Sequence, residues 1–216
     1  MLTLKFGGTS MGSAQRILDS VEIMIGRAKS DRISVVVSAV AGVSNKLQEA
    51  IDGCISGQSP EAYVQQLHSI HTEILAELKS TIPSLNTETV SAKIAPLFDE
   101  LKKLLSAISA FGECPDNAHC RIMGMGELLC SPIVEAVLSA KGQSVLLLDS
   151  RKYIFTTGSQ KEICGNRQSQ KNVHNTCCSN NSYDYHSPYS RRKRNRNSTF
   201  CIYGISAIYN CSCKSY

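Results

Sequence analysis

The hydrophobic residues in the first three quarters of the chain follow two spacings, one typical of strands and one typical of helices. Leu2–Phe6, Ile33–Val37 and residues 145–148 are short runs of strand length, and the second and third are strongly apolar. Such runs are typical of buried parallel strands. Between the first two, apolar residues recur at helical spacing: Ile17, Leu18, Val21, Met24, Ile25 and Ala28. The chain is therefore predicted to begin strand–helix–strand.

The middle of the chain is predicted to be almost entirely helical. A helix is expected to start near Val43 or Ser44, and residues 60–111 carry two apolar stripes separated at Pro83. A further helix is predicted over residues 122–140, with Pro132 as a kink or first-turn residue. Strands and helices in this order predict an α/β fold. We expect a three-layer αβα sandwich with a mainly parallel sheet that is incomplete.

The segment Lys-Phe-Gly-Gly-Thr-Ser at residues 5–10 carries the strongest chemical signal. Two glycines at the end of a strand let the backbone approach an anion closely, and free N–H groups before a helix bind phosphate oxygens. Lys5 would add a positive charge, and Thr9 and Ser10 would add hydroxyl donors, which include possible caps for the following helix. The alternative is an ordinary strand–turn–helix in which Lys5 only flanks the turn.

Three motifs in order resemble the aspartate kinases of the amino acid kinase family. They are residues 5–10, the segment Val-Val-Ser-Ala-Val-Ala-Gly-Val-Ser-Asn at residues 36–45, and the pair Gly126-Glu127 at a helix start. Residues 108–116 are most similar to the kinase part of the bifunctional aspartokinase/homoserine dehydrogenases. The resemblance covers residues 1–159.

The resemblance implies ATP-dependent phosphorylation of the L-aspartate side-chain carboxylate to 4-phospho-L-aspartate, with Mg²⁺ accompanying ATP. In the family this is the first step of lysine, threonine and methionine biosynthesis. Lys5 would be catalytic through contact with the transferred phosphoryl group. Ser44 and Glu127 would bind aspartate, Glu127 through the α-ammonium group. The ATP-binding residues would be Lys5, Gly7, Gly8, Thr9, Ser10 and Ser38.

Each of these positions also has a purely structural interpretation. Ser38 could only close its turn, Ser44 could be a helix N-cap, and Glu127 could be a first-turn residue stabilised by the helix dipole. Cys114, Cys120 and Cys130 show no metal-ligand spacing, so no metal-binding residue is expected. Two other functions stay open: a non-catalytic nucleotide- or phosphate-binding fragment, and a kinase of a different amino acid.

The composition changes near residue 160. Residues 1–159 hold 18 Leu and a net charge of −2, whereas residues 160–216 hold no Leu and a net charge of +7. We expect two parts: the N-terminal part of an aspartate kinase domain over 1–159, and a non-homologous, out-of-frame and disordered tail over 160–216. A basic nucleic-acid-binding tail around residues 191–196 and a zinc module are alternatives. The ligands of the zinc module would be Cys164, His174, Cys177, Cys178, His186, Cys201, Cys211 and Cys213.

The family pattern also includes a Gly-Ser-Asp-Tyr segment that this sequence does not contain. The chain is therefore expected to be inactive as a fragment. Since the N-terminus has no signal-peptide pattern and no long apolar window occurs, we expect a cytoplasmic protein without a membrane-spanning helix. The expected partners are L-aspartate and ATP rather than membranes or nucleic acid, and full-length relatives are expected to be homo-oligomers.

Overall fold

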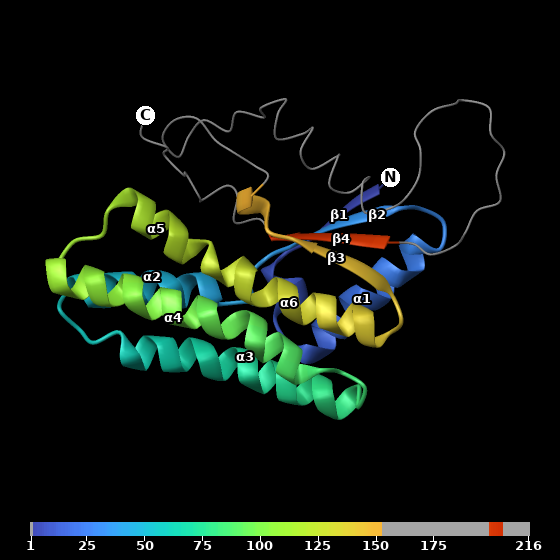
Figure 1. Cartoon of the computed structure of the whole chain (residues 1–216), viewed down its shortest axis with the longest axis horizontal. Helices are drawn as coiled ribbons and strands as arrows, with labels where there is room; N and C mark the ends of the chain where they lie inside the picture. Colours follow the sequence, from blue (N-terminus) through green and yellow to red (C-terminus); the bar gives the residue numbers. More distant parts are fainter. Residues whose placement is uncertain (1, 153–198, 205–216) are drawn as a thin grey trace, which may run out of the picture.

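The computed structural model describes residues 2–152 and 199–204, which contain one parallel sheet (Figure 1). Its strands are β1 (Leu2–Phe6), β2 (Ile33–Val37), β3 (Ser144–Leu148) and β4 (Thr199–Gly204), in the order β1-β2-β4-β3. The register pairs Phe6 with Val37. The three strands predicted from hydrophobic runs are confirmed, β3 with one extra residue at its start.

Strand β4 lies between β2 and β3 and pairs in parallel with both. It comes from the segment predicted to be a tail, of which residues 199–204 are described here and the remainder lies outside the described residues. Apart from Cys201, the residues of the zinc and nucleic-acid alternatives also lie outside the described residues. The sequence of β4, Thr-Phe-Cys-Ile-Tyr-Gly, is rich in aromatic and β-branched residues, which favour strands.

The described helices lie on one side of the sheet (Figure 1). Helices α1 (Ala14–Ala28) and α6 (Met125–Ala140) pack against the strands. The long helices α3 (Glu61–Thr81) and α4 (Thr87–Phe111) pack outside them, together with α2 (Val43–Ile55). The predicted α/β fold with an incomplete set of layers is confirmed, as are the helix start at Val43 and the break near Pro83.

The helix predicted over residues 122–140 corresponds to α6, which starts three residues later, at Met125, and a short helix that was not predicted precedes it. Helix α5 (Asp116–Met123) follows Pro115, whose extended backbone (φ −61°, ψ 148°) makes it a suitable residue before a first turn. Gly124 ends α5, and α6 starts at the next residue. The span Asp116–Ala140 is long and apolar enough to cross a membrane, yet 78% of its most apolar window is buried inside the fold. Helix α6 is therefore a core helix, whereas α5 buries only Cys120 and Ile122.

The N-terminal cap of α1 also differs from expectation. Thr9 and Ser10 lie in a 3₁₀ turn (Gly8–Met11), and the cap is Ser13, whose Oγ accepts a hydrogen bond from the backbone N–H of Arg16 (3.3 Å). A 3₁₀ turn between the strand and the helix shifts the helix start by several residues. The hydroxyls of Thr9 and Ser10 are consequently not used as caps.

His71 is a buried histidine in the outer helical layer, with no exposed surface. Its Nδ1 lies 2.7 Å from the carbonyl oxygen of Leu67 and therefore donates to it, whereas Nε2 has no hydrogen-bond partner in the described part of the chain. The ring of Phe98 packs edge-on, 5.9 Å away. Burial lowers the pKa of His71 although the Leu67 hydrogen bond opposes the shift, and the nearby His68 lowers it further. His71 is thus held neutral.

We expect acid to destabilise the fold through His71. Because its folded-state pKa is lowered, stability is complete above the ordinary value of about 6.5 and is lost as the pH falls below it, by up to ~1.4 kcal/mol per pH unit. Urea unfolding at pH 7.5, 6.0 and 5.0 measures this loss, and His71→Leu should reduce it much more than His68→Gln, which removes only the smallest cause of the lowered His71 pKa. Equal loss in wild type and His71→Leu would contradict the assignment.

Candidate active site

The turns after β1 and β2 lie against each other at the carboxyl edge of the sheet. The backbone N–H of Ser38 donates to the carbonyl oxygen of Phe6 (3.0 Å), which joins the two strand ends. A Cβ added at Gly8 would lie 3.5 Å from the carbonyl oxygen of Ala39, and one at Gly12 would lie 3.1 Å from the Cβ of Ala41. Ligands of open α/β sheets bind at this edge, so the two turns mark the position of the candidate site.

Lys5 lies over the first turn. Its side chain is exposed, and a Cβ added at Gly7 would lie 3.5 Å from Lys5 Nζ. The absence of a side chain at Gly7 therefore lets the ammonium group approach the backbone of the turn. The turn itself is fixed by a hydrogen bond from Ser10 N–H to the carbonyl oxygen of Gly7 (3.0 Å). This arrangement places a positive charge beside backbone that an anion can approach closely.

The second turn, residues 38–42, leads directly into α2. Gly42 has φ 81° and precedes the first helical residue without a side-chain cap. Ser44 is the second residue of α2 and is exposed, so its interpretation as an N-cap is wrong. Ser38 is half-buried and closes the turn through its backbone N–H, which leaves its hydroxyl available for another role.

Glu127 is buried in the first turn of α6, with 6% of its surface exposed. Burial raises the pKa of its carboxyl group, although hydrogen bonds from the backbone N–H groups of Glu127 and Ala39 and the charge of Lys5 oppose this. Its Oε2 atom has no partner in the described part of the chain. A surface glutamate stabilised only by a helix dipole would be exposed with its pKa lowered. The geometry therefore favours a carboxylate whose Oε2 atom binds a ligand group.

Three separate segments thus meet at one place. The backbone of Ala39 and the charge of Lys5 both act on the Glu127 carboxylate, which links the strand β1, the second turn and the start of α6. Thr9 and Ser44 lie on the flanking elements, and Ser10 is tied to α1 by a hydrogen bond from Ser20 Oγ (3.1 Å). Sequence reasoning missed Ala39, because a backbone N–H leaves no signature in a side-chain pattern.

Cys130 lies on the same helix as Glu127 and is fully buried. Burial, together with the negative charge of Glu127, raises the pKa of its thiol to about 12. The thiol therefore stays protonated at neutral pH and is unsuited to act as a nucleophile or metal ligand. No group of three or more His, Cys, Asp or Glu side chains able to hold a metal ion occurs in residues 2–152.

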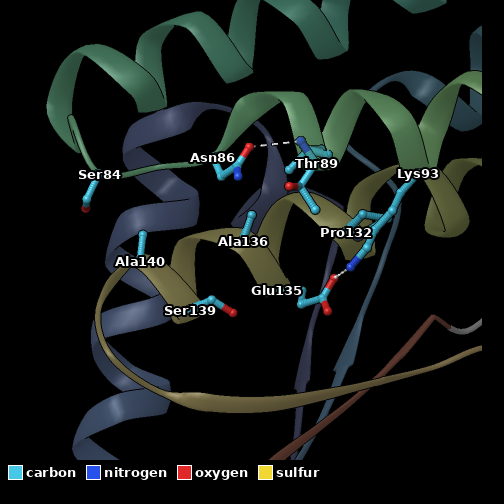
Figure 2. Close-up of a pocket in the computed structure, with 10 residues that line it drawn as sticks. Ser84, Asn86, Thr89, Lys93, Pro132, Glu135, Ala136, Ser139 and Ala140 are labelled. Atoms are coloured by element: carbon cyan, nitrogen blue, oxygen red, sulfur yellow. Dashed lines mark hydrogen bonds and ion pairs between the residues drawn. The ribbon is translucent and has the colours of Figure 1, made fainter.

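A separate surface pocket of about 320 Å³ lies between the start of α4 and the second half of α6 (Figure 2). Lys93 and Glu135 form an ion pair of 2.5 Å across it, and Asn86 caps α4 by accepting from Thr89 N–H. Its charged groups already satisfy each other, and it lies at the far end of α6 from Glu127. The edge that carries Lys5 and Glu127 is therefore the better candidate active site.

Comparison with known proteins finds sequence similarity to aspartokinases. The chain is 28% identical over 180 residues to the bifunctional aspartokinase/homoserine dehydrogenase of Buchnera aphidicola, covering 81% of this chain and 22% of that protein. It is 29% identical over 166 residues to the aspartokinase of Chlamydia pneumoniae, covering 76% of this chain and 33% of the relative. By sequence, the chain is thus similar to aspartokinases. No family model matches it.

The fold of the chain is similar to that of solved aspartokinase structures. Crystal structures of Escherichia coli aspartokinase III match with a TM-score of 0.72 for the complex with lysine and aspartate, and 0.71 for the complex with aspartate and ADP. The match covers 94% of this chain and 40% of that protein at 18% identity. The chain spans between about a fifth and a third of the length of the two curated relatives above.

Proposed function

We propose that this chain provides phosphate- and aspartate-binding elements of an aspartate kinase. The reaction is the ATP-dependent phosphorylation of the L-aspartate side-chain carboxylate to 4-phospho-L-aspartate. The observation that carries the proposal is the buried Glu127 carboxylate, with one unpartnered oxygen, beside a glycine turn that bears Lys5. It is supported by the aspartokinase relatives and by the aspartate and ADP bound to Escherichia coli aspartokinase III.

In this proposal the glycine turn binds the phosphates of ATP. Lys5 contacts the γ-phosphoryl group as it transfers and offsets its negative charge, while the backbone of Gly7 and Gly8 allows close approach. Thr9, Ser10 and Ser38 contribute hydroxyl donors. Mg²⁺ arrives with ATP as part of that substrate. Phosphoryl transfer depends mainly on positioning and on neutralising charge, which a lysine and oriented N–H groups can supply.

Aspartate is held by its amino group and reacts through its side chain. Glu127 Oε2 accepts from the α-ammonium, and Ser44 contributes a hydroxyl from the start of α2. A side-chain oxygen of aspartate forms a bond to the γ-phosphorus while the bond from that phosphorus to the β–γ bridging oxygen breaks, and ADP leaves. The attacking carboxylate is already ionised at pH 7, so the step needs no general base.

The wider setting of the proposal follows from the same assignment. Residues 1–159 would form the N-terminal part of the kinase domain, and the protein would act in the cytoplasm within an assembly of identical subunits. Because the sequence contains no Gly-Ser-Asp-Tyr segment, the 216-residue chain alone should bind Mg-ATP weakly and give no turnover. What remains is largely an electrostatic attraction, which salt screens.

Hydroxylamine trapping and calorimetry together test the proposed function. The chain is titrated with L-aspartate, L-glutamate and N-acetyl-L-glutamate, and then incubated with Mg-ATP, each amino acid and hydroxylamine. We expect L-aspartate to bind most tightly and no hydroxamate to form. Tighter binding of another amino acid would indicate a different amino acid kinase. Binding of Mg-ATP without binding of any amino acid would indicate a non-catalytic nucleotide-binding fragment.

A further inference from the structure

Helix α6 approaches the turn after β2 unusually closely at Gly126. A Cβ atom built on Gly126 would lie 2.6 Å from the Cβ of Ala39, 3.4 Å from Val43 Cγ1 and 3.6 Å from Leu47 Cδ1. Carbon atoms in favourable contact are about 3.5–4.0 Å apart. Any side chain at position 126 would therefore force the helix and the turn apart.

The obstacle is one that cannot rotate away. The methyl group of Ala39 is fixed to the backbone, whereas a Cβ at Gly53 would meet the hydroxyl end of Tyr63 and the side-chain oxygen of Gln58, which can both move. Gly126 is also not required by backbone conformation, since it lies inside α6 and is not among the glycines with positive φ. Glycine within a helix costs about 1 kcal/mol relative to alanine, so its benefit must come from the close approach.

The groups on both sides of this contact belong to the candidate site. Glu127 is the next residue along α6, and the backbone N–H of Ala39 donates to its carboxylate. A displacement at Gly126 would therefore separate the carboxylate from that donor and change the direction of the unpartnered Oε2 atom.

We propose that Gly126 is a positioning residue for aspartate recognition. Its missing side chain lets α6 approach Ala39 closely enough for the Ala39 N–H to hold one oxygen of Glu127, which directs the other oxygen toward the substrate ammonium. This inference rests on the proposed function of Glu127 in binding aspartate. It adds a geometric requirement that the identity of Glu127 alone does not supply.

The first test measures L-aspartate affinity of the 216-residue chain by calorimetry. Gly126→Ala should weaken binding by roughly 10-fold, because a displaced carboxylate makes a poorer charge-assisted hydrogen bond to the substrate ammonium. Adding Ala39→Gly removes the opposing methyl group and should restore affinity to within about threefold of wild type. Gly26→Ala in α1 is the matched control, since a Cβ there meets nothing within 4 Å.

The second test needs no ligand. In wild type, the NMR shift of the Ala39 amide proton should follow the ionisation of Glu127, because that N–H donates to the carboxylate. Gly126→Ala should reduce the amplitude of this titration by at least half, and the double variant with Ala39→Gly should recover it. An unchanged amplitude in Gly126→Ala would overturn the positioning role.

The two tests separate the failure of this inference from the failure of the proposed function. If wild type binds no L-aspartate but the Ala39 amide behaves as expected, the proposed function fails and the positioning of Glu127 stands. If L-aspartate binds equally to wild type and Gly126→Ala, the positioning role fails. Should Gly126→Ala not fold, the double variant decides: it must fold and recover both signals, and its failure to do so overturns the proposal.

Discussion

Replacing Glu127 by Gln is expected to weaken L-aspartate binding by about 100-fold. The substitution keeps the shape of the side chain but removes the charge that would pair with the substrate ammonium. Loss of one partner from a buried, hydrogen-bonded charge pair costs about 2–5 kcal/mol, and 100-fold corresponds to about 2.7 kcal/mol. Calorimetry at pH 7 gives the affinity of each variant.

The control for this prediction is Glu135→Gln, on the same helix. Glu135 is ion-paired with Lys93 in the pocket at the other end of α6, so its neutralisation should leave L-aspartate affinity within about twofold of wild type. An equal effect of both substitutions would show that general charge, rather than Glu127, governs binding.

The same Glu127→Gln protein should be no less stable than wild type when unliganded. Burial raises the folded-state pKa of Glu127, so wild type loses stability as the pH rises from its ordinary value of about 4.3 through the raised value. The Gln variant lacks this loss and should be the more stable protein at pH 7, with the difference disappearing in acid. Urea unfolding of both proteins at pH 7 and in acid measures this difference. A Gln variant that is at least as stable as wild type at pH 7 excludes misfolding as the cause of weak binding.

The second large effect is expected at Lys5. Lys5→Ala should weaken Mg-ATP binding by roughly 10- to 100-fold, because a hydrogen bond to a charged group contributes about 1.5–3 kcal/mol. The wild-type affinity should fall as salt is raised from 20 to 200 mM, and the variant should show a shallower fall because it lacks that charge. Fluorescence competition or calorimetry at two salt concentrations measures both quantities.

Lys29→Ala is the matched control for Lys5. Lys29 is an exposed lysine at the end of α1, just before β2 and therefore at the opposite edge of the sheet. Its removal changes the net charge of the chain by the same amount without touching the glycine turn. Mg-ATP affinities that fall equally in both variants would contradict a specific phosphate contact at Lys5.

Much of the fold could be predicted from local patterns because the physics of those elements is local. The short runs at Leu2–Phe6 and Ile33–Val37 formed strands with the predicted bounds, although only the second is buried along most of its length, whereas the first buries Phe6 alone. The break between α3 and α4 fell near Pro83, because a proline in a helix interior removes a hydrogen bond.

Other features depend on contacts that a single segment does not encode. The division of residues 116–140 into α5 and α6 required knowing that Gly124 ends a helix rather than lying within one. The pairing of β4 between β2 and β3 joins residues more than 50 positions from either neighbour, and no strand was predicted there because residues 160–216 were expected to be a disordered tail. The cap at Ser13 depended on an intervening 3₁₀ turn.

Some features of the candidate site could likewise be predicted from sequence, and others could not. The glycine turn and the Gly126-Glu127 pair could be found from sequence, because a motif preserves the order of its residues. The burial of Glu127, the approach of Lys5 Nζ to Gly7 and the hydrogen bond from Ala39 could not, because each joins different elements. These contacts are the geometric basis for the hypothesis that Glu127 binds the α-ammonium group of L-aspartate.

The comparison of L-aspartate with succinate tests that hypothesis most directly. The two dicarboxylates share a four-carbon chain, and succinate lacks only the α-ammonium group that Glu127 is proposed to bind. Calorimetric titration of the 216-residue chain at pH 7 should show L-aspartate binding at least ~10-fold more tightly than succinate, consistent with a charge-assisted contact. Equal affinities for the two compounds would contradict the assignment of Glu127 and the account built on it.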